Sequence, residues 1–129
     1  MAKRILVVED DAALREVLQD ALEFEGYVVA TAGHGVEAME GILATPPDLV
    51  VCDMLLPGMD GSDLAAELLR RGLRPGLPLV FLTGSDRARE AIGQTGADAL
   101  FEKPVGLAEL IAAIGRLTGE TEGGASPPS

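Results

Sequence analysis

Apolar residues along this chain form short uninterrupted runs, and these runs alternate with segments in which apolar residues recur every three or four positions. The runs predict five strands, at residues 5–8, 27–30, 49–52, 79–82 and 99–101. Because the runs are apolar at consecutive positions instead of every second one, both faces of each strand should be covered.

The intervening segments predict five helices. Asp11 is a suitable N-cap for the first helix, and Gly26 follows its end. The second helix covers residues 36–43 and stops before Pro46-Pro47. Apolar positions at helical spacing mark the first, third, fourth and fifth helices: Leu14, Val17, Leu18, Ala21 and Leu22; Leu64, Ala65, Leu68 and Leu69; Ala88, Ala91 and Ile92; Leu107, Leu110, Ile111, Ile114 and Leu117.

Fivefold strand–helix alternation predicts an α/β fold, with a doubly wound five-stranded parallel sheet and helices on both faces. The flavodoxin-like (βα)₅ version has strand order 2-1-3-4-5. Residues 1–118 should form this domain. Residues 119–129 are rich in Gly, Ser, Pro and Glu, so we expect a flexible tail or the start of an interdomain linker.

Composition limits the partners and the compartment. The chain has 21 acidic and 10 basic residues, a net charge of −11, which disfavours direct contact with nucleic acid or an anionic membrane. Only four apolar residues follow Lys3-Arg4, too few for a signal peptide, and no run approaches the roughly 18 that a membrane helix needs. The single cysteine, Cys52, lies within a strand run and reads as a buried apolar residue. We therefore expect a cytoplasmic protein without membrane contact.

The residues that could take part in catalysis or ligand binding follow the carboxyl ends of the predicted strands. Ligands of open α/β sheets bind at that end of the sheet. If the first and third strands are neighbours, several carboxylates converge there and repel one another unless a cation is present. All-oxygen ligands favour a hard ion, Mg²⁺ or Mn²⁺. The residues concerned are Glu9, Asp10, Asp11, Asp53, Thr83 and Lys103.

Two of these residues suit a phosphoryl group. Thr83 offers a hydroxyl donor and Lys103 a mobile positive charge. A carboxylate in such a site can act as a nucleophile and become an aspartyl phosphate. We assign Asp11 to helix capping and not to ligand binding.

The order and spacing of Glu9-Asp10, Asp53, Thr83-Gly84 and Lys103-Pro104 resemble those of the receiver domains of bacterial response regulators. The segments at residues 5–10, 53–61 and 95–98 are similar to that family as well. The resemblance covers about residues 3–118 and implies a phosphorylation-dependent switch of two-component signalling.

The resemblance implies a role for each motif residue. Asp53 is the phosphoacceptor, and Glu9 and Asp10 hold Mg²⁺ together with Asp53 and the backbone carbonyl of Leu55. The implied phosphodonor is a sensor histidine kinase or a histidine phosphotransfer protein, and the downstream partner is unknown.

The remaining motif residues surround the phosphoryl group in the family. Thr83 hydrogen-bonds it and moves on activation, Gly84 leaves room for the donor, and Lys103 stabilises the transferred charge. The peptide bond before Pro104 is cis in the family.

Two departures from the family pattern concern the output. Leu100 occupies the position of the usual Tyr or Phe switch residue, and the stretch from Thr83 to Lys103 is short. We therefore predict an atypical output face and a monomeric protein.

Two other functions stay open at this point. A pseudo-receiver would bind partners without phosphorylation, although Asp53, Thr83 and Lys103 argue against it. A small phosphatase of the haloacid dehalogenase type would need an Asp at the position of Leu55.

One further motif gives no function. Gly33-His34-Gly35 lacks the third glycine of a dinucleotide fingerprint, because Ala38 stands there. We interpret it as a surface turn with a solvated His34.

Overall fold

The computed structural model describes residues 2–56, 58–74, 76–84 and 97–119. Within them, five parallel strands form one sheet in the order β2-β1-β3-β4-β5. This confirms the predicted fold and strand order. The strands are β1 (Arg4–Val8), β2 (Val28–Ala32), β3 (Leu49–Asp53), β4 (Leu79–Thr83) and β5 (Ala99–Glu102).

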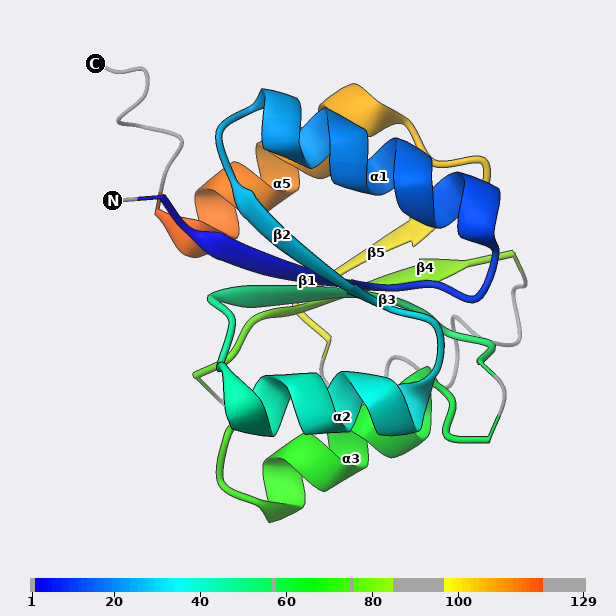
Figure 1. Cartoon of the computed structure of the whole chain (residues 1–129), viewed down its shortest axis with the longest axis vertical. Helices are drawn as coiled ribbons and strands as arrows, with labels where there is room; N and C mark the ends of the chain where they lie inside the picture. The colour runs from blue at the N-terminus through cyan, green and yellow to red at the C-terminus, as the bar shows by residue number, and fades with distance from the viewer. Residues whose placement is uncertain (1, 57, 75, 85–96, 120–129) are drawn as a thin grey trace.

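The described helices cover both faces of the sheet. Figure 1 shows α1 (Ala12–Phe24) and α5 (Leu107–Thr118) on one face, and α2 (Gly35–Ala44) and α3 (Gly61–Arg70) on the other. The helix predicted at Ala88, Ala91 and Ile92 lies outside the described residues, as does most of the predicted tail. No helix in the described part of the chain has the length and apolar character to cross a membrane.

The element boundaries differ from the predicted ones by one or two residues. The largest difference is in β2, which begins at Val28 and continues to Ala32. Tyr27 precedes the strand because its N–H donates to Leu22 O, at the end of α1 (3.1 Å). Gly26 adopts a positive φ between them, as predicted for a residue that follows a helix.

The core is aliphatic and has two halves, one on each face of the sheet. Successive strand residues contribute to opposite halves: Phe81 packs on the α2/α3 side, whereas Val80 and Leu82 pack on the α1/α5 side. Cys52 is fully buried on the α2/α3 side, and its burial raises the pKa of its thiol. Cys52 is therefore a core residue, as predicted.

Side chains cap the helices near the carboxyl edge of the sheet. Asp11 Oδ1 accepts hydrogen bonds from the N–H groups of Ala13 (3.0 Å) and Leu14 (3.3 Å), which confirms the predicted cap. His34 is exposed, but it also caps α2, because its Nδ1 accepts the N–H of Glu37 (3.2 Å). The sequence interpretation of His34 as merely solvated missed this role.

Two glycines allow helices to begin against the loop that follows β3. A Cβ on Gly61 would lie 2.8 Å from Phe81 Cε1 and 2.9 Å from Met54 Sδ. A Cβ on Gly35 would overlap the carbonyl of Met59. The close packing at these two points fixes the segment that leaves Asp53.

Candidate functional site

Asp53 lies at the carboxyl end of the central strand β3 and is only 6% exposed. One oxygen of its carboxylate, Oδ1, accepts the N–H of Leu55 (3.2 Å). The other, Oδ2, accepts a hydrogen bond from Lys103 Nζ (2.8 Å). Both carboxylate oxygens of Asp53 are therefore held by hydrogen bonds at the carboxyl end of the central strand.

Glu9 follows the neighbouring strand β1 and is completely buried. Its Oε2 accepts the N–H of Asp11 (3.1 Å). Its Oε1 lies 3.1 Å from Lys103 Nζ, yet within the described residues it has no partner in hydrogen-bonding geometry. Burial raises the pKa of Glu9 to about 7. The charge of Asp53 adds to the rise, whereas the hydrogen bond from Asp11 and the ion pair with Lys103 oppose it.

Lys103 is the cation shared by these two carboxylates. Partial burial lowers its pKa, but the hydrogen bond to Asp53 and the ion pair with Glu9 outweigh that effect, so its pKa is raised. The ammonium group is therefore charged across the physiological range. The N–H of Lys103 donates to Thr83 O (2.8 Å), and the peptide bond to Pro104 is cis.

The acidic residues converge as the sequence predicted. Carboxylate oxygens of Glu9, Asp10 and Asp53 all lie within 4.8 Å of one another, with Asp10 exposed. This set of oxygen donors fits a small divalent cation. Glu9 Oε1 supports that fit, because it is buried and ion-paired with Lys103 but lacks a hydrogen-bond donor among the described residues.

Thr83 ends β4 on the other side of Asp53 and is 1% exposed. Register places Asp53 beside Leu82, so Thr83 lies one residue further along the same edge. A Cβ built on the next residue, Gly84, would have no neighbour within 4 Å among the described atoms. None of the described residues therefore fills the space beside Gly84.

Leu55 and Leu100 are the two apolar residues among the predicted site positions. The side chain of Leu55 is 66% exposed. Leu100 pairs with Phe81 across β4 and β5 and packs against the α2/α3 half of the core, the face toward which Thr83 also points. Phe101 belongs to the opposite half, so it does not replace a ring at position 100.

Arg15 contacts the site and was not predicted. Its Nη1 donates to the backbone carbonyl of Glu9 (2.7 Å), and it thereby fixes the turn that carries Glu9 and Asp10. Nothing in the sequence pattern marks this contact, because Arg15 occupies an ordinary polar position of the first helix.

Comparisons with known proteins agree with this geometry. Residues 5–115 match the model of the response regulator receiver domain. Response regulator MprA of Mycobacterium tuberculosis is 40% identical over 124 residues, covering 95% of this chain and 53% of that protein. The chain therefore belongs to the response regulator receiver domain family, the phosphorylation-dependent switches of two-component signalling.

Solved structures give the same result. A putative response regulator from Chloroflexus aurantiacus has a TM-score of 0.87 and 33% identity, covering 92% of this chain and 99% of that one. The receiver domain of a signal transduction histidine kinase from Syntrophus aciditrophicus has a TM-score of 0.86 and 32% identity, covering 94% and 93%. The chain spans about half the length of the curated relatives it matches.

The raised pKa of Glu9 predicts a pH-dependent stability in the absence of metal. Glu9 titrates near 4.5 when unfolded and near 7 when folded, so between these values the folded protein holds a proton that the unfolded chain has lost. The free energy of unfolding should fall by about 1–3 kcal/mol as pH rises from 5 to 7.5. Glu9→Gln should remove most of that fall, as measured by urea denaturation in EDTA.

The matched control is Glu16→Gln, on an exposed position of α1, which should keep the wild-type slope. Since a bound cation competes with the proton on Glu9, 10 mM MgCl₂ should stabilise the wild type more at pH 8 than at pH 6. An unchanged pH slope in Glu9→Gln would contradict the assignment.

Proposed function

We propose that this domain is a switch that accepts a phosphoryl group on Asp53 from a phosphohistidine of a sensor histidine kinase or a histidine phosphotransfer protein. The observation that carries the proposal is Lys103, whose ammonium lies 2.8 Å from Asp53 Oδ2 and 3.1 Å from Glu9 Oε1. That arrangement neutralises charge where an anionic phosphoryl group must approach a carboxylate.

In the proposed transfer, a carboxylate oxygen of Asp53 attacks phosphorus, the P–N bond of the donor breaks, and an acyl phosphate forms. Lys103 moves its pairing from the carboxylate to the phosphoryl oxygens. The Thr83 hydroxyl donates to one of those oxygens, and Gly84 leaves space for the donor. The phosphoryl group stays on Asp53 of the domain itself. The domain is therefore a switch that catalyses its own phosphorylation and not a conventional enzyme.

Glu9, Asp10, Asp53 and the backbone carbonyl of Leu55 are the proposed ligands of Mg²⁺, with Mn²⁺ as a substitute. When bound, the cation supplies positive charge that offsets the carboxylates and the incoming phosphoryl oxygens. Two features of Glu9 support this assignment: its burial, and the lack of a hydrogen-bond donor to its Oε1 among the described residues.

The alternative functions lack comparable support. A pseudo-receiver would not require Asp53, Thr83 and Lys103 to meet at one edge, yet here all three do. A phosphatase that uses Asp53 as nucleophile would need an acid two residues later, where the apolar Leu55 stands. The function is proposed for the receiver domain alone and does not identify a downstream partner or an output domain.

The central prediction is Mg²⁺-dependent phosphorylation of Asp53. Incubation with acetyl phosphate or a phosphorylated histidine kinase should add one phosphoryl group to the wild type, about 80 Da by intact mass, and none to Asp53→Asn. Beryllofluoride should compete with labelling. Equal labelling of both proteins, or labelling that is insensitive to chelator, would refute the proposal.

We also predict slow self-dephosphorylation. Leu55 is apolar and exposed two residues past Asp53, so it shields the phosphoryl group and cannot orient an attacking water. Leu55→Asn should therefore hydrolyse several-fold faster, as measured by loss of the phosphorylated mass. Leu69→Asn, at a similarly exposed leucine on α3, should not change the rate. An equal or slower rate for Leu55→Asn would show that shielding does not set the lifetime.

The output face should respond only locally. Leu100 has no ring and no hydroxyl, so it offers little differential interaction between the two states of Thr83. Amide NMR shifts on adding beryllofluoride should concentrate near Thr83, with partners binding at α1 and the loop after Lys103. Leu100→Tyr should extend the shifts along β5, and Phe101→Leu, on the opposite face, should not. Wild-type shifts throughout β5, together with phosphorylation-dependent dimerisation, would contradict this.

A further inference from the structure

The edge strand β2 leaves backbone hydrogen-bonding groups open. Val28 N–H donates to Lys3 O (2.9 Å) and Ala32 O accepts Glu9 N–H (3.0 Å), so these residues direct their backbone groups toward β1. Because the direction alternates along a strand, Val29 and Thr31 direct theirs outward. Within the described residues, no hydrogen bond to these outward groups is present.

This edge has none of the usual protection against pairing with another strand. Natural edge strands carry charged residues, prolines or bulges that prevent such pairing. Residues 28–32 read Val-Val-Ala-Thr-Ala, without charge or proline, and their register with β1 is continuous. The strand is therefore a suitable template for another strand.

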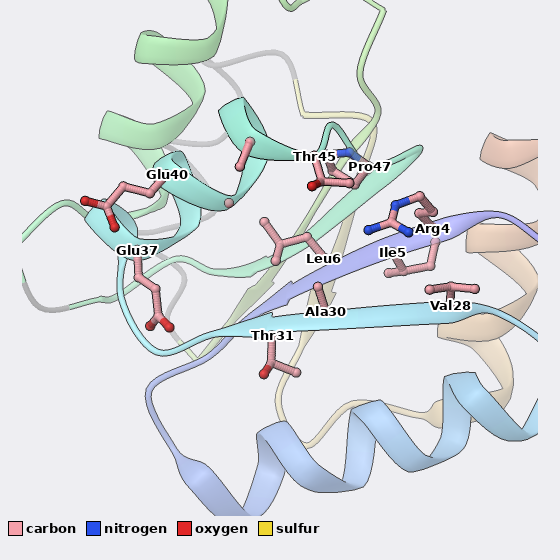
Figure 2. A pocket seen from close by; sticks show the side chains of 12 residues that line it. Arg4, Ile5, Leu6, Val28, Ala30, Thr31, Glu37, Glu40, Thr45 and Pro47 are labelled. Atoms are coloured by element: carbon pink, nitrogen blue, oxygen red, sulfur yellow. The ribbon is translucent and has the colours of Figure 1, made fainter.

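A groove of about 410 Å³ runs beside this edge, between β2 and α2 (Figure 2). Val28 and Ala30 of the strand and Ala44 of the helix contribute apolar surface. Arg4 lies at the amino end of β1, and its Nε is buried without a hydrogen-bond partner among the described atoms. Glu37 lies at the other end of the groove, in the first turn of α2. The groove therefore has the Arg4 guanidinium at one end, where the Asp48 carboxylate also accepts the backbone N–H of Arg4 (2.7 Å), and the carboxylates of Glu37 and Glu40 toward the other end.

In place of the monomer expected from the sequence, we propose that β2 pairs with β2 of a second copy of this chain, antiparallel and about a two-fold axis at Ala30. In this register Val29 of each copy lies opposite Thr31 of the other. Each strand has four outward backbone groups, the N–H and C=O of Val29 and of Thr31, and the two strands together form four hydrogen bonds that use all of them. Registers centred on Val29 or Thr31 use only half of them.

The same register matches the charges. Antiparallel pairing brings the Arg4 end of each groove to the Glu37 end of the other, so the surface is self-complementary, as a two-fold interface requires. It also covers Val28 and Ala30. A peptide of another protein would satisfy the backbone groups, but it would need its own charges in the matching order.

The pairing is independent of phosphorylation. Asp53 lies on β3, two strands in from this edge, so both sites stay accessible in the pair. The interface also differs from the β5 side discussed for Leu100. Each chain carries a net charge of −11, so repulsion between the two copies opposes association. Salt screens this repulsion and should therefore strengthen association.

The first test is sedimentation equilibrium of the unphosphorylated chain from 10 µM to 1 mM in 0.3 M NaCl. The wild type should approach twice the monomer mass at the upper end. Thr31→Pro removes an outward N–H without touching the β1 ladder and should weaken association at least tenfold. Thr31→Val keeps that N–H and should associate like the wild type. A wild type that stays monomeric at 1 mM overturns the proposal.

The second test does not depend on how Thr31→Pro folds. Ala30 would lie opposite its own copy in a non-hydrogen-bonded pair, where Cβ atoms are close enough for a disulfide. Under mild oxidation Ala30→Cys should form a covalent dimer rapidly, and native Cys52 is buried and should not react. Phe24→Cys, on a more exposed position of α1, is the control. Cross-linking of Ala30→Cys that is no faster than that of the control would show that the two Ala30 positions do not meet, and this result overturns the proposal.

Discussion

The structure depends on one electrostatic constraint: a single ammonium group must hold two buried carboxylates that would otherwise repel each other. Lys103 Nζ lies 2.8 Å from Asp53 and 3.1 Å from Glu9, and Glu9 is fully buried. Burying charges costs free energy that a partner recovers only with good geometry. The raised pKa of Glu9 shows that one cation does not fully offset two buried acids. A further positive charge beside these carboxylates would lower that pKa.

Much of the fold serves to keep these groups at one edge. The strand order makes β1 and β3 neighbours, which brings Glu9 beside Asp53 although they are far apart in the chain. An aliphatic core buries the central strands on both faces of the sheet. Gly61 and Gly35 let α3 and α2 begin tightly against the loop after Asp53. A side chain at either glycine would displace the segment on which Asp53 is held.

The sequence was sufficient for the architecture and for the residues that meet at the site, because both follow from patterns that are local in the chain. Continuous apolar runs predict buried parallel strands, and polar residues at strand ends meet once the strands are parallel. The contacts it did not predict are those that depend on side-chain direction across distant segments. The cap from His34, the bond from Arg15 to the Glu9 carbonyl and the complete burial of Glu9 are of this kind.

The division of the sheet into two faces also limits how the site can communicate. Thr83 points toward the α2/α3 half of the core, where its neighbours on the same face of β4 and β5 are Phe81 and Leu100. Phe81 is completely buried against Gly61, so its ring has no second position to occupy without disturbing the start of α3. Leu100 is aliphatic and has no polar group whose exposure could differ between two states. Among the described residues, the surface that Thr83 faces therefore contains no bistable element, and we expect the response to leave the site through backbone segments at the carboxyl ends of the strands instead of through that face.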